Sequence, residues 1–513
     1  MPASDATPAA PASPDASFAR WVETKASWIV AVALLAALFW IVLYRHFTVD
    51  DAFISFRYGK NLVAHRVWNW NPSGTHEEAY TSFVYTALGI VPALLHLSPV
   101  LFFKFFGLGC IAAMVYRVRT VSTTPFAVLL GLLLIGLHPW TWLHAFSGLE
   151  TPLYMLLLLE MAICVHRAAA TPASWAYTLF LLLPLTRPEG IVFACVGVAL
   201  FWSRRASAPG HFGAFAVTLL LGLLYFFVRW RYFHHLLPNP YYLKLAPSAG
   251  SSTWGEIRSY LIENLTEAKG YFLVLSLICA FARLRYTRIF ALSGILLLLL
   301  LYAPHAMQMT YAERFYFQVA FPLLLFFLMT EDLPQIARMA AVAAAVCLFS
   351  VNFQFLRNGP RLFQFGVQSD IGLGRRLAPF AGNHTLLAGS SGAVPYYSNW
   401  TAYDFYGLGT YRIVHDGIGT PMLQELHPDL ILIDGTESGL EAASAASTRG
   451  INSDRDVEID FVLHSGEYDN VGATGTHGIG PLEFLRKTTP DHDRIARALQ
   501  QLPQTPSPPP MPH

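Results

Sequence analysis

Apolar runs of helical length, separated by short polar segments, fill the chain from about residue 27 to residue 350. The first run extends from about Ser27 to Tyr44. Ten further runs start near Pro99, Thr124, Thr151, Trp175, Gly190, Phe212, Lys269, Ile289, Phe315 and Gln335. Because a helix needs about 20 apolar residues to cross the ~30 Å hydrocarbon layer, the pattern predicts a polytopic α-helical membrane domain of about eleven spans over residues 27–350.

Residues 1–26 precede the first run and are rich in Ala, Pro and Ser, a composition typical of a disordered segment. The segment is too long for the n-region of a cleavable signal peptide, so the first run should stay as an anchor helix. With this terminus in the cytoplasm, Lys and Arg gather in every second loop, as the positive-inside rule requires. The orientation also requires that the apolar stretch Thr81–Leu97 lies along the outer surface without crossing.

Strand-like and helix-like pieces alternate after residue 350. HTLLAGSSGAVPYYS (384–398) and HPDLILIDG (427–435) are typical of buried strands, and LGRRLAPFA (373–381) and PMLQEL (421–426) of short helices. We therefore expect an extracytoplasmic α/β domain over residues 351–500. The remaining residues, 501–513, form a Pro-rich tail.

Composition excludes several other classes of protein. Hydrophobic residues make up 54% of the chain and charged residues only 13%, whereas a soluble domain carries about 25% charge. The formal net charge of +1 gives no reason to expect nucleic acid as a partner. The sequence also lacks the GxxxxGK[ST], HExxH, CxxC and GxSxG motifs, which disfavours a P-loop ATPase, a zincin, a thiol oxidoreductase and an α/β hydrolase.

Two adjacent carboxylates, Asp50 and Asp51, follow the first apolar run at the start of the first outer loop, residues 47–98. One of them could simply cap the helix that follows, but a cap needs only one acid. In the functional interpretation, one carboxylate accepts a proton from a sugar hydroxyl. The other orients it, or Asp50, Asp51 or Glu78 helps to hold a divalent cation through oxygen ligands.

Other polar segments of the predicted outer face place charge beside apolar runs. They contribute Glu77 and Glu78, Glu150, Arg187 and Glu189, Asn239, Tyr241 and Lys244, and Glu313 and Arg314. Ionisable groups at membrane depth are costly and therefore functional candidates, and an Arg there can bind a phosphate through two hydrogen bonds. The alternatives are internal ion pairs for Arg187 and Arg314, helix capping for the two glutamates, and interfacial snorkelling for Lys244.

Seven motifs occur in order along residues 48–320. They are DDAFISFRYGKNL (50–62), WNWNPSG (68–74), EAYTS (78–82), SGLET (147–151), RPEG (187–190), LPNPYYLK (237–244) and ERFYF (313–317). Together they resemble the GT-C superfamily of membrane glycosyltransferases, and within it the bacterial arabinofuranosyltransferase-like proteins of the mycobacterial terminal arabinofuranosyltransferase branch. Ala79 stands where that branch usually has Gly, and the acid before it is doubled.

The resemblance implies inverting transfer of a sugar, such as arabinofuranose, from a polyprenyl-phosphate donor to a glycan, lipid or protein acceptor outside the bacterial cytoplasmic membrane. It implies that Asp50 is the general base and Asp51 assists it. Glu78 would lie near the acceptor or a metal, and Arg187, Lys244 and Arg314 near the lipid phosphate. The other residues expected to contact substrate are Arg57, Tyr80, Glu150, Glu189, Asn239 and Tyr241.

Two alternatives share the membrane architecture. The first is a transferase that modifies protein or lipopolysaccharide instead of arabinan. The second is a non-catalytic transporter or flippase of lipid-linked sugars, which predicts symmetric halves, broken helices and ionisable residues at mid-membrane. We find no internal repeat in the sequence, and the informative acids lie at the predicted outer edge.

Overall fold

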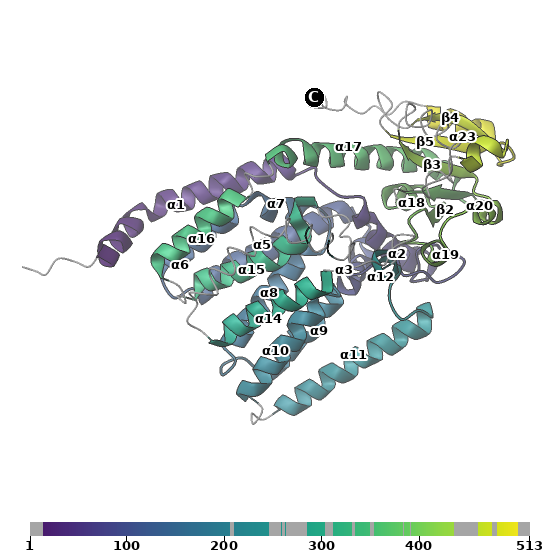
Figure 1. Cartoon of the computed structure of the whole chain (residues 1–513). Coiled ribbons are helices and arrows are strands. Elements are labelled where there is room, and N and C mark those ends of the chain that lie inside the picture. Colours follow the sequence, from purple (N-terminus) through teal and green to yellow (C-terminus); the bar gives the residue numbers. More distant parts are fainter. Residues whose placement is uncertain are drawn as a thin grey trace, which may run out of the picture.

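The computed structural model describes residues 14–205, 210–245, 285–302, 311–330, 334–348, 353–435, 460–473 and 480–500, with positions 258 and 262 and without positions 383 and 390. The span expected near Lys269 and the tail 501–513 lie outside the described residues. The described part is a bundle of apolar helices with a mixed five-stranded sheet at one end (Figure 1).

The helices of the bundle lie roughly side by side (Figure 1). They are α1 (Pro14–Tyr44), α5 (Pro99–Val121), α6 (Pro125–Leu137), α7 (Pro139–Phe146), α8 (Thr151–His166), α9 (Ala173–Thr186), α10 (Gly190–Arg205), α11 (His211–Phe233), α14 (Arg285–Tyr302), α15 (Arg314–Met329) and α16 (Gln335–Leu348). Among the described residues, Thr24–Tyr44 of α1 and the helices α5, α11 and α14 are long and apolar enough to cross a membrane.

The pair α6 and α7 forms a fifth candidate span, which is bent by 59° at a short break. Pro139 opens α7 directly after the break, and Pro is well placed in a first helical turn, where its missing N–H has no partner to lose. The helices α8, α9, α10 and α15 are apolar but shorter, at 10–17 residues. The apolar runs thus fold as helices, while the number of about eleven spans stays a prediction.

Local sequence signals set several helix starts. Ser98 accepts a hydrogen bond from the backbone N–H of Leu101 at 3.4 Å, and Thr124 accepts one from Ala127 at 3.2 Å. Both caps are followed by Pro at the first helical position. The helix α1 also starts at a Pro, Pro14, and therefore extends into the segment 1–26 for which we expected disorder. The last Pro of that segment stands at the helix start, so no Pro interrupts the residues that follow it.

The first outer loop folds into α2 (Asp51–His65), α3 (Phe83–Leu88) and α4 (Ile90–Leu94). The stretch Thr81–Leu97 thus forms two short helices around Gly89. The backbone of α2 crosses this point so closely that a Cβ on Gly59 would lie 2.4 Å from the carbonyl oxygen of Gly89. Glycine at position 59 therefore permits the packing of α2 against α3 and α4. A further short helix, α12 (Asn239–Leu245), follows α11.

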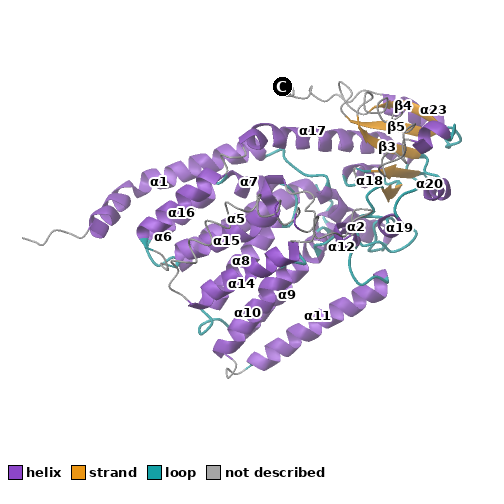
Figure 2. Cartoon of the chain, in the orientation of Figure 1, coloured by secondary structure: helices purple, strands orange, loops and turns teal. Residues whose placement is uncertain are grey.

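The C-terminal sheet has the strand order β2-β1-β3-β5-β4. The strands β2, β1 and β3 pair in parallel, and β5 pairs antiparallel with both β3 and β4. The strands are β1 (Thr385–Ala388), β2 (Thr401–Asp404), β3 (Leu430–Gly435), β4 (Tyr468–Ala473) and β5 (Gly480–Arg486), and the helices are α17 (Phe353–Leu377), α18 (Ala393–Ser398), α19 (Tyr411–Asp416), α20 (Thr420–Leu426) and α23 (His492–Gln500). Figure 2 shows that the described strands gather in this one region. One face of the sheet packs on α17 and α23, and the other on α19 and α20.

The first outer loop belongs to the hydrophobic core of this sheet. Ile54, Tyr58 and Trp70 are buried in the same cluster as Leu386 and Leu430 of β1 and β3. Packing side chains from two distant parts of the chain into one core fixes their relative position. The sheet and the acidic loop therefore form one rigid unit.

One predicted strand is wrong in its second half. Thr385–Ala388 is a strand, but residues 393–398 form the helix α18. Pro395 has no N–H to donate to a strand ladder, and Gly392 ends the extended segment before it. The predicted strand at 427–435 is confirmed over Leu430–Gly435. The predicted helix at 421–426 lies in α20, and the one at 373–381 divides into the end of α17 and a short 3-10 helix, Ala378–Phe380.

Candidate functional site

The carboxylate of Asp50 binds the C-terminal domain. It stands at the N-cap position of α2 but makes no side-chain cap hydrogen bond there. Its Oδ2 accepts a hydrogen bond from the backbone N–H of Gly392 at 2.8 Å, and its Oδ1 accepts one from Ala393 at 2.7 Å. Capping of its own helix therefore does not explain Asp50. Both oxygens contact a segment 342 or more positions away along the chain.

The neighbouring carboxylate, Asp51, is half-buried at the start of α2. It lies within electrostatic range of Tyr311 and of Asp404. Tyr311 in turn interacts with the side chains of Ser147 and Arg314. Asp51 therefore shares its surroundings with the arginine at the start of α15.

Arg187 lies at the centre of a buried ion-pair cluster. Its Nη1 donates to Glu150, and its Nε donates to Oε1 of Glu189 at 2.5 Å. Gln318 of α15 donates to the same Glu189 oxygen at 2.9 Å. The structure thus brings together the three predicted residues Glu150, Arg187 and Glu189. It also favours the ion-pair interpretation for Arg187, because two carboxylates already compensate its charge.

Arg314 is different, although it is also buried. Its guanidinium carbon lies 4.8 Å from the ring centre of Phe315, and that of Arg187 lies 5.1 Å from the same ring. Within the described part of the chain, Arg314 forms no ion pair with a carboxylate; the side chain of Glu313 lies outside that part. Of the predicted phosphate ligands, Arg314 is therefore the described arginine that a bound anion could neutralise.

Glu78 is held by an arginine that sequence reasoning missed. Arg229 of α11 donates from Nε to Oε1 of Glu78 at 3.0 Å and from Nη2 to Oε2. Burial raises the pKa of Glu78, and the hydrogen bonds and charge of Arg229 oppose this. Tyr80 also opposes the rise in the pKa of Glu78, and its hydroxyl accepts a hydrogen bond from Nε1 of Trp68 at 2.9 Å. Two arginines at the end of the apolar run of α11, Arg229 and Arg231, were the available signal for this pair.

Two further predicted substrate residues connect the loop with the C-terminal domain. Arg57 donates to the carbonyl oxygen of Trp70 at 2.6 Å and to that of Trp400 at 2.8 Å. Asn239 donates to Oε2 of Glu77 at 2.9 Å and to the carbonyl oxygen of Leu408 at 3.1 Å. These contacts describe structural connections, and contact with substrate stays a prediction for both residues.

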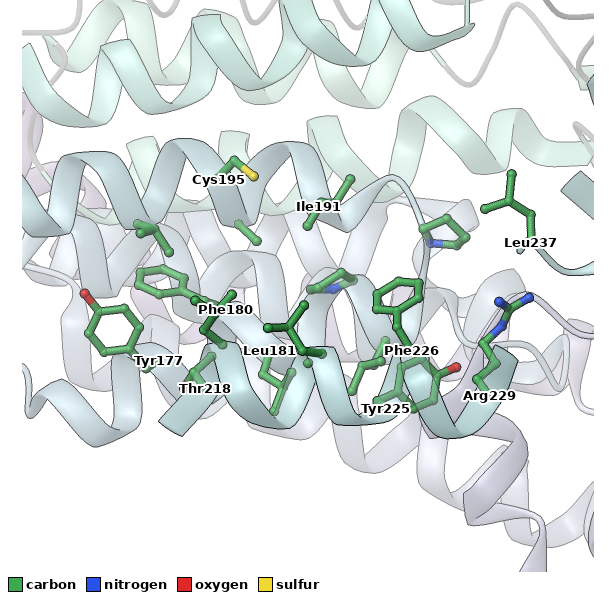
Figure 3. Close-up of a pocket in the computed structure, with 18 of the residues that line it drawn as sticks. Tyr177, Phe180, Leu181, Ile191, Cys195, Thr218, Tyr225, Phe226, Arg229 and Leu237 are labelled. Carbon is green, nitrogen blue, oxygen red and sulfur yellow. The ribbon is translucent and has the colours of Figure 1, made fainter. Parts of the chain in front are cut away.

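An apolar groove of about 960 Å³ runs along α9, α10 and α11 (Figure 3). Its walls carry Phe180, Leu181, Ile191, Cys195 and Phe226, and Figure 3 shows Arg229 and Tyr225 together at one end. At this end the lining includes Glu78, Tyr241 and Pro188, the neighbour of Arg187. Lys244 lies on α12 beyond Tyr241, but its side chain lies outside the described residues. The groove thus joins an apolar channel to the charged residues.

The described residues do not fit a divalent-cation site. Among them, no group of three or more His, Cys, Asp or Glu side chains is arranged to hold a metal ion. Two of the three predicted ligands are bound to N–H donors, Asp50 to backbone amides and Glu78 to Arg229. The carboxylate oxygens of Asp50 and Glu78 therefore do not point to a common position where they could bind one cation.

Two solved structures of one protein share the fold of the chain. The chain is similar over 90% of its length to ArnT from Cupriavidus metallidurans, in structures bound to undecaprenyl phosphate (TM-score 0.51, 12% identity) and in the apo state (TM-score 0.53, 11% identity), covering 98% of that chain in each. It is also similar to the archaeal oligosaccharyltransferase AglB from Archaeoglobus fulgidus in complex with an inhibitory peptide and a dolichol-phosphate (TM-score 0.45, 11% identity, 91% of this chain and 75% of that chain).

Sequence comparison adds one finding. Residues 364–496 match the model of a domain of unknown function, DUF8728. No curated protein matches the chain. The chain shares the fold of ArnT. With its long apolar helices, the protein is therefore a polytopic membrane protein, as its sequence predicts.

Proposed function

We propose that the protein is an inverting glycosyltransferase that moves a sugar from a polyprenyl-phosphate donor to an acceptor hydroxyl. The observation that carries this proposal is the apolar groove along α9, α10 and α11 with charged residues at one end. A polyprenyl chain is apolar along its length and carries its phosphate at one end. The groove matches this distribution of polarity, since apolar surface leaves contact with water when such a chain binds.

We place the donor phosphate beyond the end of the groove that Glu78, Arg229 and Pro188 line, where Arg187, the neighbour of Pro188, shares the ring of Phe315 with Arg314. Arg314 is the described candidate without an ion pair, while Arg187 carries two carboxylate partners. The phosphate leaves the sugar as an anion, so a guanidinium beside it stabilises the charge that develops in the transition state. The undecaprenyl phosphate bound to ArnT, whose fold the chain shares, supports this class of carrier.

The acceptor reacts on the opposite face of the sugar. A carboxylate of the acidic pair Asp50 and Asp51 takes the proton of the acceptor hydroxyl. The hydroxyl oxygen forms a bond with the anomeric carbon as the bond from that carbon to the phosphate oxygen breaks. The products are the glycosylated acceptor, with inverted configuration, and free polyprenyl phosphate, and the proton stays on the carboxyl group until solvent removes it.

The finer assignment rests on the sequence. The seven ordered motifs favour arabinofuranose as the sugar and a cell-envelope glycan, lipid or protein as acceptor. The distribution of Lys and Arg favours a bacterial cytoplasmic membrane protein with its N-terminus inside and the 351–500 domain outside.

Purified protein in lipid nanodiscs tests the proposal. It is incubated with a panel of polyprenyl-phosphate sugars and an acceptor glycan, and donor loss and polyprenyl phosphate release are measured. We expect one donor sugar to be consumed by the wild type and by Gly372→Ala, because a Cβ at Gly372 meets no atom within 4 Å. The Asp50→Asn/Asp51→Asn double variant should be inactive. Movement of the donor across the bilayer without its consumption would instead favour the transporter alternative.

A further inference from the structure

The two acids of the pair face different partners. Both carboxylate oxygens of Asp50 accept hydrogen bonds from consecutive backbone amides, those of Gly392 and Ala393, at 2.8 and 2.7 Å. Hydrogen bonds of this kind, from N–H groups to an ionised carboxylate, are among the stronger ones in proteins. They stabilise the charged carboxylate and oppose its protonation. A general base has to become protonated, so these contacts make Asp50 poorly suited to that task.

The approach of the two backbones is specific to glycine. A Cβ on residue 392 would lie 2.0 Å from the carbonyl oxygen of Asp50 and 2.6 Å from its Oδ2. The carbonyl oxygen cannot move away cheaply, because it belongs to the backbone at the start of α2. The contact between Asp50 and the 392–393 segment therefore requires both the carboxylate of Asp50 and a glycine at position 392.

The segment that holds Asp50 is itself anchored within the C-terminal domain. Ser391 donates to the carbonyl oxygen of Ala388 at the end of β1, at 3.0 Å. The side chain of Ser391 also lies close enough to the buried carboxyl of Asp404 to lower its pKa. Asp404 in turn accepts from the backbone N–H groups of Tyr406 at 2.9 Å and Gly409 at 3.1 Å. The two amides thus belong to a rigid turn at the ends of two strands.

The helix α2 is fastened to the same domain further along its length. Lys60 donates to the carbonyl oxygen of Tyr396 at 2.6 Å and lies 4.5 Å from the centre of its ring. Arg57 donates to the carbonyl oxygen of Trp400 at 2.8 Å. The start of α2 and the residues that follow it are therefore positioned together by α18 and its flanks.

Asp51 has other neighbours. It lies within electrostatic range of Tyr311, which interacts with Arg314, and of Asp404. Asp51 is therefore the member of the pair whose charged and aromatic surroundings include the proposed phosphate ligand.

We propose that Asp51 is the general base and that Asp50 is a positioning residue, which fastens the start of α2 to the backbone of Gly392 and Ala393 in the C-terminal domain. This assignment rests on the proposed function and reverses the roles that the family resemblance implies. In the reaction, the acceptor hydroxyl gives its proton to Asp51 and its oxygen joins the anomeric carbon. The bond from that carbon to the donor phosphate breaks, and the phosphate takes the electron pair.

Steady-state kinetics of four single variants separate the two roles. Asp51→Asn should lower kcat by about 100-fold or more, the usual contribution of a general base, with little change in the KM for donor. Asp50→Asn removes one of two acceptor atoms and Gly392→Ala forces the backbones apart, so both should show the same smaller loss. Gly372→Ala is the matched control in the same domain and should behave as the wild type.

Hydrogen exchange measured on the same proteins supplies a second readout. The backbone amides of Gly392 and Ala393 should exchange faster in Asp50→Asn and Gly392→Ala than in the wild type. Exchange at these amides should be unchanged in Asp51→Asn, because Asp51 makes no hydrogen bond to them. The acid limb of the pH–rate profile should persist in Asp50→Asn, since the base is still present.

Three outcomes overturn the assignment. Loss of kcat in Asp50→Asn as large as in Asp51→Asn, with unchanged exchange at residues 392 and 393, would identify Asp50 as the base. Near-normal kcat in Asp51→Asn would remove Asp51 from the chemistry. If the wild type consumes no donor, the proposed function fails and the base assignment with it, while hydrogen exchange still judges the contact between Asp50 and the C-terminal domain.

Discussion

Two buried carboxyl groups of the C-terminal domain hold their protons unusually strongly. Burial raises the pKa of Asp404 to about 7 and that of Glu483 to about 8. Within the described part of the chain, neither oxygen of Glu483 has a hydrogen-bond partner, and Arg376 is the charged group near it. A carboxyl with a raised pKa in the folded protein binds its proton up to a higher pH than in the unfolded chain. Its stabilising contribution is full at low pH and is lost as the pH rises through the folded pKa.

Glu483→Gln should therefore stabilise the protein only at high pH. As the pH rises from 5 to 9, the free energy of unfolding of the variant should increase relative to that of the wild type by a few kcal/mol. The reason is that Gln cannot ionise in the buried site. Thermal unfolding of the purified protein in detergent, followed at both pH values, measures this difference. The exposed Glu425, which pairs with Arg412, offers the matched control, since neither charge of that pair changes between pH 5 and pH 9 and Glu425→Gln should leave the pH dependence unchanged. An equal effect of Glu483→Gln at both pH values would contradict the burial explanation.

The pair of Glu78 and Arg229 makes a second residue-level prediction. Removing one member of a buried ion pair leaves the other charged without compensation, at a cost of about 3–5 kcal/mol. Glu78→Gln and Arg229→Met should each lower the melting temperature strongly. The double variant should lose much less stability than the two single variants lose together. A double-mutant cycle on the purified protein measures this difference. Additive losses would mean that the two side chains do not stabilise each other.

Single residues were recognisable in the sequence, but their partners were not. The acidic pair, Glu78 and Arg187 stood out because charge is rare beside apolar runs. Asp50 nevertheless binds amides 342 and 343 positions away, and Glu78 binds an arginine 151 positions away. Local patterns carry no information on such distant contacts, so the role of each acid could not be assigned.

At the level of elements, the groove is a property of three helices together. The apolar runs predicted α9, α10 and α11, and the structure contains all three. Which of their faces form a groove depends on how each helix is turned about its axis. These helices are apolar on most sides, so the sequence does not define that rotation.

Two glycines of α11 allow a direct test of the groove. Gly222 lines it, with Leu181 at 3.8 Å from a Cβ placed there, whereas Gly213 does not line it and a Cβ there meets nothing within 4 Å. Gly222→Phe should fill part of the groove and raise the KM for the polyprenyl-phosphate donor by about tenfold or more, the effect of about 1.4 kcal/mol in binding. Gly213→Phe is the matched control and should leave this KM unchanged. Equal KM values in the two variants would exclude the groove as the lipid site.

At the level of the whole molecule, hydrophobic patterning predicted the polytopic architecture and the change of character near residue 350. It missed how closely the two regions are joined. Asn71 of the first outer loop both donates to and accepts from the backbone of Ala402, at 2.9 and 3.0 Å, along the edge strand β2. An unpaired strand edge is a liability, and here the loop covers it. A side chain that replaces a strand partner leaves no periodic signal in the sequence.

The proposed activity of the whole molecule is the transfer of a sugar from a polyprenyl-phosphate donor. The most direct measurement is mass-spectrometric quantification of polyprenyl phosphate released from polyprenyl-phosphate arabinofuranose by purified protein in nanodiscs with an acceptor glycan. We predict one polyprenyl phosphate released for each sugar found on the acceptor, and loss of this release in Asp51→Asn. Release at the same rate by Asp51→Asn would contradict the assignment of the general base, and no release from any polyprenyl-phosphate sugar by the wild type would contradict the proposed function.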